Sequence, residues 1–286
     1  MQTIKNKSQV RVTTQAWKRE GLSVALVPTM GNLHDGHLKL VEHALQHADK
    51  VVVSIVVTPI QIGEHEDFDS YPRTLDRDSA LLAEHGVDLL FAPEVSEIYA
   101  DQDDQLTQVC VPGLSEILCG SFRPGHFAGV TTIVAKLFNI VQPDLAVFGE
   151  KDYQQLFLIR KMVLDLDYPV KILGLPTVRE QDGLAMSSRN SYLSQDERQR
   201  ASLLSKMLAK LKEDIRQGDR EYIKLQENAH KILEKYGFSV DYVDIRNAET
   251  LHPAQPHDIH IVLLVAARLG ATRLIDNMTL DLSDIM

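Results

Sequence analysis

The chain has 286 residues, of which 44% are hydrophobic and 24% are charged, so it is long enough to bury one large core or two moderate cores. Its formal net charge of −10 argues against a general nucleic-acid-binding surface, because phosphate backbones are held mainly by clustered Lys and Arg. No segment reaches the roughly 20 apolar residues of a membrane helix, the N-terminus lacks the apolar region of a secretory signal, and Cys110 and Cys119 form no CxxC pair. We therefore expect a cytoplasmic globular protein with reduced cysteines and no membrane or nucleic-acid partner.

A short buried strand followed by an amphipathic helix is predicted near the start of the chain. Residues 24–27 form an apolar run, and apolar side chains recur at helical spacing from residue 38 to residue 48. Between them lies the segment PTMGNLHDGH, residues 28–37, so the helix begins near Asp35 or Gly36. The first turn of a helix has unpaired N–H groups that favour an anion, and glycine lets a phosphate approach the backbone. This junction therefore predicts a phosphate site.

His34 and His37 lie three residues apart on this helix and share one face, so both side chains can reach one ligand group. The alternative is an ordinary pair of surface histidines. A metal pair would more usually have i, i+4 spacing with a third ligand nearby.

The following segments alternate between strands and helices. Strands are predicted at residues 51–57, 87–91, 145–148 and 170–173, with helices at 75–85, at 131–141 and between the last two strands. Their apolar runs are continuous, which indicates that both faces of the sheet are covered, as in a Rossmann-like, doubly wound parallel α/β sheet. Ligands of such sheets bind beyond the carboxyl ends of the strands, here in the loops at Pro28, Thr58, Gly149 and Leu175.

The composition changes after about residue 177, and a smaller α+β domain is predicted there. Residues 194–236 are typical of two charged helices separated near Gly218, followed by strands at 238–245, 261–267 and 272–275. We expect domains at residues 1–176 and 177–286. The acidic residues 101–104 are expected to form a solvated loop, and residues 111–118 an apolar strand.

Four further segments carry candidate chemistry: residues 58–74, 122–127, 149–155 and 182–190. The hydroxyl groups and the guanidinium of the last segment could hold phosphate oxygens. Three of these segments also have a simpler interpretation: a turn for 58–74, surface charges for 149–155 and a capped helix start for 182–190.

Five motifs together resemble the pantothenate synthetase family over nearly the whole chain. In order they are PTMGxLHxGH, QxG with EDFxxYPRT, FRPGHFxGV, GEKDYQQ and DGLAMSSRN. The HxGH and MSSR elements also resemble the wider nucleotidylyltransferase and class I aminoacyl-tRNA synthetase superfamily. The resemblance implies a homodimeric ligase of coenzyme A biosynthesis that uses ATP and Mg²⁺ to join pantoate to β-alanine through a pantoyl adenylate, releasing AMP and pyrophosphate. Residues 1–176 would bind nucleotide and pantoate, and residues 177–286 would form a lid.

The same resemblance implies roles for individual residues. The implied ATP-binding residues are Met30, Gly31, Asn32, Leu33, His34, Asp35, Gly36, His37, Gly149, Glu150, Lys151, Asp152, Val178, Met186, Ser187, Ser188 and Arg189. Those with implied catalytic roles are His34, His37, Lys151, Ser187, Ser188 and Arg189, with His37 as proton donor. Gln61 and Gln155 would bind pantoate, and Gln61 would also contact β-alanine. Asp78 is a candidate for positioning Mg²⁺ through water, or else a carboxylate on a helix surface.

These residue types suit attack of a carboxylate on the α-phosphorus, because fixed donors stabilise the charge that accumulates on oxygen and on pyrophosphate. His37 could protonate the leaving group or act only electrostatically. The chain departs from the family pattern Asn-Pro-x-Gln-Phe at Thr58 and Ile62, which predicts an altered pantoate pocket.

Three other functions compete with this interpretation. A nucleotidylyltransferase acting on a phosphate ester would need extra basic residues, and the Gln61 and Gln155 pair argues against it. A tRNA-charging enzyme would need a basic region, which is not evident. An inactive nucleotide-binding regulator stays open because of Thr58 and Ile62.

Overall fold

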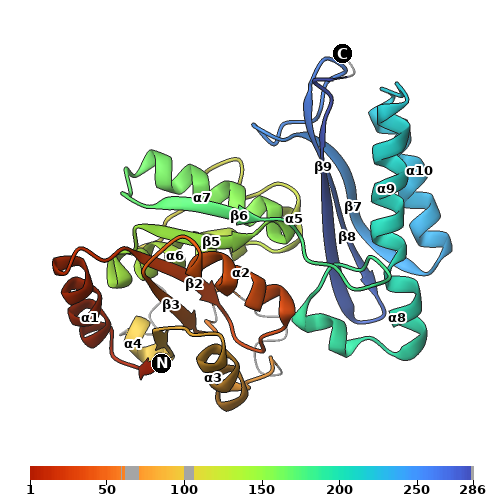
Figure 1. The fold of residues 1–286 in the computed structure, drawn as a ribbon. Coiled ribbons are helices and arrows are strands. Elements are labelled where there is room, and N and C mark those ends of the chain that lie inside the picture. Colours follow the sequence, from red (N-terminus) through yellow and green to blue (C-terminus); the bar gives the residue numbers. More distant parts are fainter. Residues whose placement is uncertain (59, 62–70, 100–105, 285–286) are drawn as a thin grey trace. The chain divides into compact units, whose positions relative to one another are not determined.

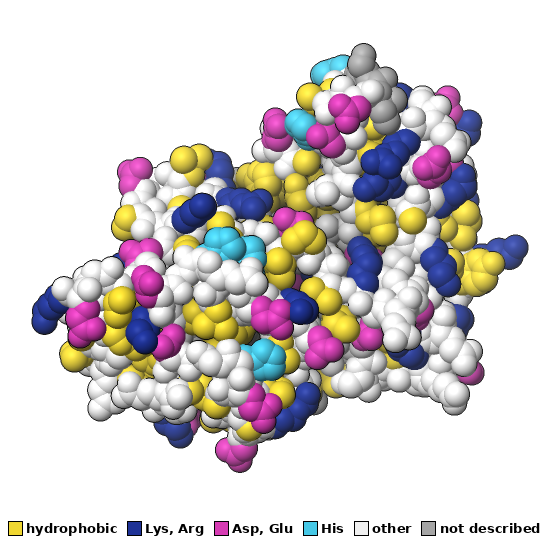
Figure 2. All heavy atoms as spheres, in the orientation of Figure 1, with side chains coloured by type: hydrophobic (Ala, Val, Ile, Leu, Met, Phe, Trp, Pro, Cys, Tyr) yellow, Lys and Arg dark blue, Asp and Glu magenta, His cyan; other side chains and the backbone are white. Residues whose placement is uncertain are grey.

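The computed structural model describes residues 1–58, 60–61, 71–99 and 106–284 (Figure 1). The chain divides into two compact units, Met1–Pro176 and Thr177–Met286. Within the described ranges, no helix is long and apolar enough to cross a membrane. On the face drawn in Figure 2, acidic and basic side chains are interspersed.

The first unit is built on a six-stranded parallel sheet in the order β1-β4-β3-β2-β5-β6. The strands are β1 (Gln2–Ile4), β2 (Val24–Thr29), β3 (Lys50–Ile55), β4 (Leu89–Phe91), β5 (Leu145–Gly149) and β6 (Lys171–Leu175). Strand order reverses between β2 and β5, since the chain moves from β2 toward β4 on one side and from β5 toward β6 on the other. This confirms the predicted α/β class and places the switch point beside β2.

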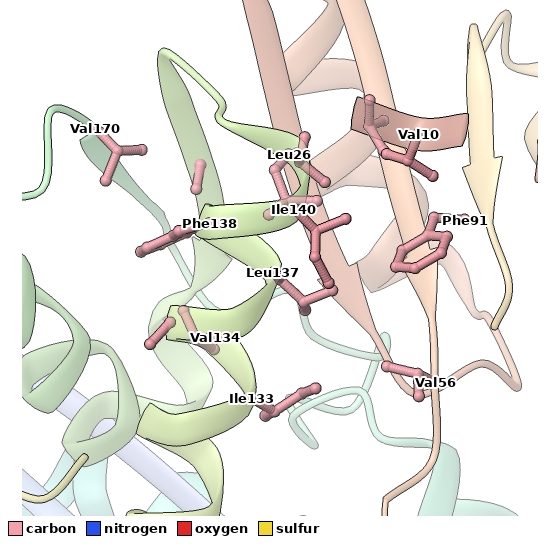
Figure 3. Close-up of a cluster of buried hydrophobic side chains, with 14 of the residues drawn as sticks. Val10, Leu26, Val56, Phe91, Ile133, Val134, Leu137, Phe138, Ile140 and Val170 are labelled. Carbon is pink, nitrogen blue, oxygen red and sulfur yellow. The ribbon is translucent and has the colours of Figure 1, made fainter. Parts of the chain in front are cut away.

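Helices cover both faces of this sheet. Successive side chains of β2 point to opposite faces, so each face needs apolar cover. Val24 and Leu26 join a core with α1, α6 and α7 (Figure 3), whereas Ala25 and Val27 join a second core with α2 and α3. The helices of the unit are α1 (Lys7–Arg19), α2 (Asp35–Leu45), α3 (Leu75–Glu84), α4 (Val95–Ile98), α5 (Cys119–Phe122), α6 (His126–Val141) and α7 (Tyr153–Asp165).

The second unit has an antiparallel sheet in the order β7-β8-β9, with strands β7 (Phe238–Asn247), β8 (His260–Leu269) and β9 (Thr272–Asp281). Helices α8 (Gln195–Ala201), α9 (Leu203–Arg216) and α10 (Tyr222–Lys235) accompany it. Apolar residues of α9 and α10, among them Leu208, Leu211 and Leu233, pack with those of β8, such as Leu263 and Val265, in one buried core.

Several predicted elements differ from the observed ones. Residues 194–236 form three helices and not two, because the chain breaks at Ser202 as well as near Gly218. The apolar segment 111–118, predicted as a strand, forms turns that include Gly113 at φ 78° and Leu118 at φ 51°. β1 and α1 are not among the predicted elements, and of the α1 residues only Val10 and Thr14 are fully buried. The acidic residues 101–104 lie outside the described residues.

Candidate active site

Two segments of the first unit that are implied in ATP binding follow adjacent strands. Residues 30–37 follow β2, and residues 150–152 form a short 3-10 helix directly after β5. Because β2 and β5 are parallel neighbours, both segments emerge at the carboxyl edge of the sheet. This is the switch point at which ligands bind in open α/β sheets.

A left-handed turn leads from β2 into α2. Gly31 has φ 82° and Asn32 has φ 49°, which glycine adopts without strain and which asparagine tolerates better than most residues. A Cβ on Gly31 would lie 3.1 Å from Ile55 Cγ2 and 3.2 Å from Asp78 Oδ2, so the position is also tightly enclosed. The turn brings His34 to the N-cap of α2.

The two histidines cap the helix with their rings. The N–H of Gly36 donates to His34 Nδ1 at 3.1 Å, and the N–H of His34 donates to His37 Nδ1 at 3.3 Å. Since both Nδ1 atoms accept, each neutral ring carries its proton on Nε2. The ring centroids are 4.0 Å apart. The site therefore presents two adjacent Nε2–H donors.

Both rings are held in the neutral form. Burial, assisted by the positive charge of Lys151, lowers the pKa of His34 to about 4, although Asp35 and Asp152 oppose this shift. Burial lowers the pKa of His37 to about 3, with further contributions from His34 and Lys151. The charge of Lys151, in the segment after β5, thus lowers the pKa of both imidazoles in the segment after β2. Donors of this kind favour phosphate oxygens.

Gln61, implied in pantoate binding, is held through both its side chain and its backbone. Thr58 is fully buried, and its hydroxyl donates to Gln61 Oε1 at 3.1 Å. The Gln61 carbonyl lies 2.7 Å from His126 Nδ1 and 3.4 Å from a donating guanidinium nitrogen of Arg123. Arg123 also lies 2.8 Å from His126 Nε2, so that nitrogen accepts and Nδ1 carries the proton toward Gln61. Ile62 lies outside the described residues.

The segment after β5 supplies two adjacent glutamines in the first turn of α7. Gln155 is half-buried. Its neighbour Gln154 is buried, donates to the carbonyls of Leu114 and Ile117 at 3.0 Å and 2.8 Å, and accepts from the N–H of Cys119 at 3.1 Å. Gln154 therefore ties the loop before α5 to the site.

In the second unit, residues 178–186 form a hairpin that ends at the serines of the MSSR motif. The N–H of Met186 donates to the Val178 carbonyl at 2.9 Å, so these two candidate ATP residues are neighbours. Ser187 then caps the short 3-10 helix of residues 188–192, accepting from the N–H of Arg189 at 3.3 Å. Ser188 and Arg189 follow on that helix, next to the hairpin.

A buried ion pair anchors this hairpin to β9. Arg179 donates to both carboxylate oxygens of Asp276, at 2.7 Å and 2.9 Å, and also to the carbonyls of Gly183 and Asn277. The Asp276 side chain is 3% exposed, so the pair is largely shielded from water. The pair is not evident from the sequence, because nothing in the local pattern links residues 97 positions apart.

Asp78, the candidate for positioning Mg²⁺, has a different environment from the one expected. It is fully buried and not on a helix surface, and both of its oxygens accept hydrogen bonds from the protein. Among the described residues there is also no group of three or more His, Cys, Asp or Glu side chains that could hold a metal.

The chain was compared with known proteins. The family model for pantoate-β-alanine ligase matches residues 2–279. Pantothenate synthetase of Alcanivorax borkumensis is 55% identical over 280 residues, covering 98% of each chain. Pantothenate synthetase of Pseudomonas fluorescens is 54% identical over 282 residues, covering 99% of each chain.

Solved structures agree with these matches. The crystal structure of pantothenate synthetase from Thermus thermophilus has a TM-score of 0.90 and 46% identity, and covers 97% of this chain and 99% of that one. Pantoate-β-alanine ligase from Francisella tularensis, complexed with β-γ ATP and β-alanine, has a TM-score of 0.81 and 32% identity, with 97% of each chain covered. The agreement spans both units of the fold, and the chain belongs to the pantoate-β-alanine ligase family.

Proposed function

We propose that this chain condenses pantoate with β-alanine in two steps, using ATP and forming a pantoyl adenylate between them. The observation that carries the proposal is the pair of neutral imidazoles that present Nε2–H donors beside Lys151 at the switch point. The relative from Francisella tularensis, complexed with β-γ ATP and β-alanine, supports the choice of substrates.

In the first step a carboxylate oxygen of pantoate bonds to the α-phosphorus, and the bond to the bridging oxygen of pyrophosphate breaks. Negative charge grows on the α-phosphate oxygens and on pyrophosphate, so donors fixed there lower the barrier selectively. His34, His37 and Lys151 are proposed to serve as these donors. Since the neutral His37 ring has no surplus proton, we infer that it acts by hydrogen bonding and not as an acid.

Further contacts to ATP are proposed for residues of both units. In the first unit they come from Met30 to His37 and from Gly149 to Asp152. In the second unit Ser187, Ser188 and Arg189 would hold phosphate oxygens, with Val178 and Met186 beside them. The hydrogen bond between Met186 and Val178 supports a joint role for these two residues.

In the second step the amine of β-alanine attacks the acyl carbon of the adenylate, and AMP leaves with the electron pair of the C–O bond. Gln61 and Gln155 are proposed to hold pantoate, with Gln61 also beside β-alanine. Neutral amides leave the attacking carboxylate reactive, whereas an arginine would stabilise it as a poorer nucleophile. Because Thr58 donates to Gln61 Oε1, the Gln61 amide nitrogen is proposed to be the group that donates to substrate.

Mg²⁺ is proposed to enter with ATP, held by the phosphates, because its sites commonly combine few carboxylates with substrate phosphates. A homodimer and a cytoplasmic location are also proposed. Cys110 and Cys119 are both reduced cysteines, which suits a reducing compartment.

The proposed function is tested by measuring pyrophosphate release and identifying the products by mass spectrometry. We expect pantothenate, AMP and pyrophosphate in equal amounts, with sustained release only when ATP, pantoate and β-alanine are all present. ATP binding without turnover would instead indicate an inactive regulator. AMP transfer to a phosphate ester would indicate the rival nucleotidylyltransferase.

A further inference from the structure

Three residues at the start of α3 hold the turn that precedes His34. Asp78 Oδ2 accepts from the N–H of Asn32 at 2.8 Å, and Asp78 Oδ1 accepts from the N–H of Leu33 at 3.0 Å. Thr74 Oγ1 donates to Asp78 Oδ2 at 3.0 Å, and Arg77 donates to the Leu33 carbonyl at 3.2 Å. We call Thr74, Arg77 and Asp78 the α3 clamp.

The Asp78 carboxylate of the clamp accepts from two backbone N–H groups that could otherwise donate to a phosphate. Successive N–H groups in a left-handed turn form a concave anion site, and here the anion is the Asp78 carboxylate. Further along the segment, the N–H groups of Gly36 and His37 are bonded to His34. The imidazole Nε2–H groups are therefore donors that this segment can still offer to a nucleotide.

The carboxylate is also poorly suited to a metal. It is fully buried, both oxygens are engaged, and a Cβ on the adjacent Gly31 would be only 3.2 Å from Oδ2. A hydrated Mg²⁺ ion keeps several water molecules and needs room for them. Asp78 instead fixes two residues whose backbone is in the left-handed region or next to it.

We propose that Asp78, supported by Thr74 and Arg77, is a positioning residue that sets the direction of the His34 and His37 rings toward ATP, and that it is not a metal ligand. This inference rests on the proposed function for its nucleotide. It assigns a role to Thr74 of the YPRT segment and to Arg77 in the helix after it, and it replaces the metal role expected for Asp78.

The principal test compares Asp78→Asn with Asp76→Asn, a matched change in the same helical turn at an exposed position. An asparagine has only one acceptor oxygen, so one of the two N–H groups loses its partner. We expect the dissociation constant of ATP, measured by calorimetry without pantoate, to rise about ten- to hundredfold. We also expect kcat to fall, with KM for pantoate changed less than twofold. Asp76→Asn should match the wild type.

Thr74 provides a second test if Asp78→Asn does not fold. Thr74→Val removes one hydrogen bond to the carboxylate, and Thr74→Ser retains it. We expect weaker ATP binding, about threefold or more, in the valine variant only. Because ATP binding is measured directly, this result does not depend on which acid the enzyme activates, so the inference and the proposed function can fail separately.

The dependence on Mg²⁺ separates positioning from metal binding. A positioning role predicts the same half-saturating Mg²⁺ concentration in Asp78→Asn and in the wild type at saturating ATP. Recovery of Asp78→Asn activity by excess Mg²⁺ would overturn the proposal. So would a lower melting temperature with unchanged ATP affinity and kcat, since that would leave only a structural role.

Discussion

At the scale of single residues, His34 and His37 use the same ring nitrogen for structure and leave the other for chemistry. Nδ1 of each ring accepts a backbone N–H at the start of α2. Helix capping thus fixes the tautomer, and burial with Lys151 keeps the rings neutral. An arrangement of this kind can stabilise a developing phosphate charge without a proton transfer.

The neutral form of His34 and His37 predicts how kcat/KM for ATP depends on pH. The pKa values of His34 and His37 are lowered to about 4 and about 3, so the neutral form, in which Nδ1 accepts and Nε2–H donates, is complete above roughly pH 5 and becomes imidazolium only on acidification. The kcat/KM for ATP reports the free enzyme. We expect the ratio of this constant between wild type and His37→Gln, about a hundredfold, to stay level from pH 6 to pH 9.

Taking that ratio cancels the ionisation of ATP itself. A wild-type value that fell tenfold per pH unit above pH 6.5, relative to His37→Gln, would show that an imidazolium acid is required and would refute the hydrogen-bonding role.

Residue roles were predictable from sequence only where they are local. The spacing of His34 and His37 indicated a shared helix face, but not that each ring also bonds to the backbone. Asp78 contacts Asn32 and Leu33, which lie 46 and 45 positions earlier, and its burial could not be read from its own helix. The polar bonds that fix a site are mostly long-range, whereas sequence periodicity reports only neighbours along one element.

At the scale of elements, α6 supports the loop that carries Gln61. The N-terminal turn of α6 supplies His126, and Gly129 faces the same loop one turn later. A Cβ on Gly129 would lie 2.0 Å from the Ile60 carbonyl oxygen, so this close approach requires glycine. The histidine and the second glycine of the FRPGHFxGV motif thus both support the Gln61 segment, which their spacing alone does not reveal.

A Gly129→Ala variant should therefore displace the Gln61 loop. We expect KM for pantoate to rise about tenfold and stability to fall by about 1–3 kcal/mol, because the added methyl group meets backbone and not a flexible side chain. KM for ATP serves as the internal control and should change less than twofold. Equal effects on both substrates would mean that the change spreads through the whole sheet.

The hairpin of residues 178–186 depends on the ion pair between Arg179 and Asp276. An Arg179→Met variant leaves the Asp276 carboxylate buried without its partner, which should destabilise the protein by about 3 kcal/mol. The exposed pair of Arg198 and Asp182 is the matched control, and Arg198→Met should cost less than about 1 kcal/mol. Denaturant unfolding of both variants checks this. Equal losses in the free energy of unfolding would show that the burial of Asp276 does not increase the cost of removing its partner.

At the scale of the molecule, fold class was more predictable than element number. Continuous apolar strands such as β2 require cover on both faces, and the two cores on opposite sides of the sheet supply it. The break at Ser202 between α8 and α9 lacks a glycine or proline signal, so the sequence suggested one helix there. The two units have separate cores, and the candidate residues for ATP are divided between them.

The central claim is that the α-phosphorus of ATP is the atom attacked by pantoate, and isotope transfer tests it most directly. Pantoate labelled with ¹⁸O in both carboxylate oxygens is turned over with ATP and β-alanine, and the masses of the products are measured by mass spectrometry. Attack on the α-phosphorus predicts one ¹⁸O in AMP and one in the amide carbonyl of pantothenate. Label found in inorganic phosphate or pyrophosphate, with unlabelled AMP, would contradict the account.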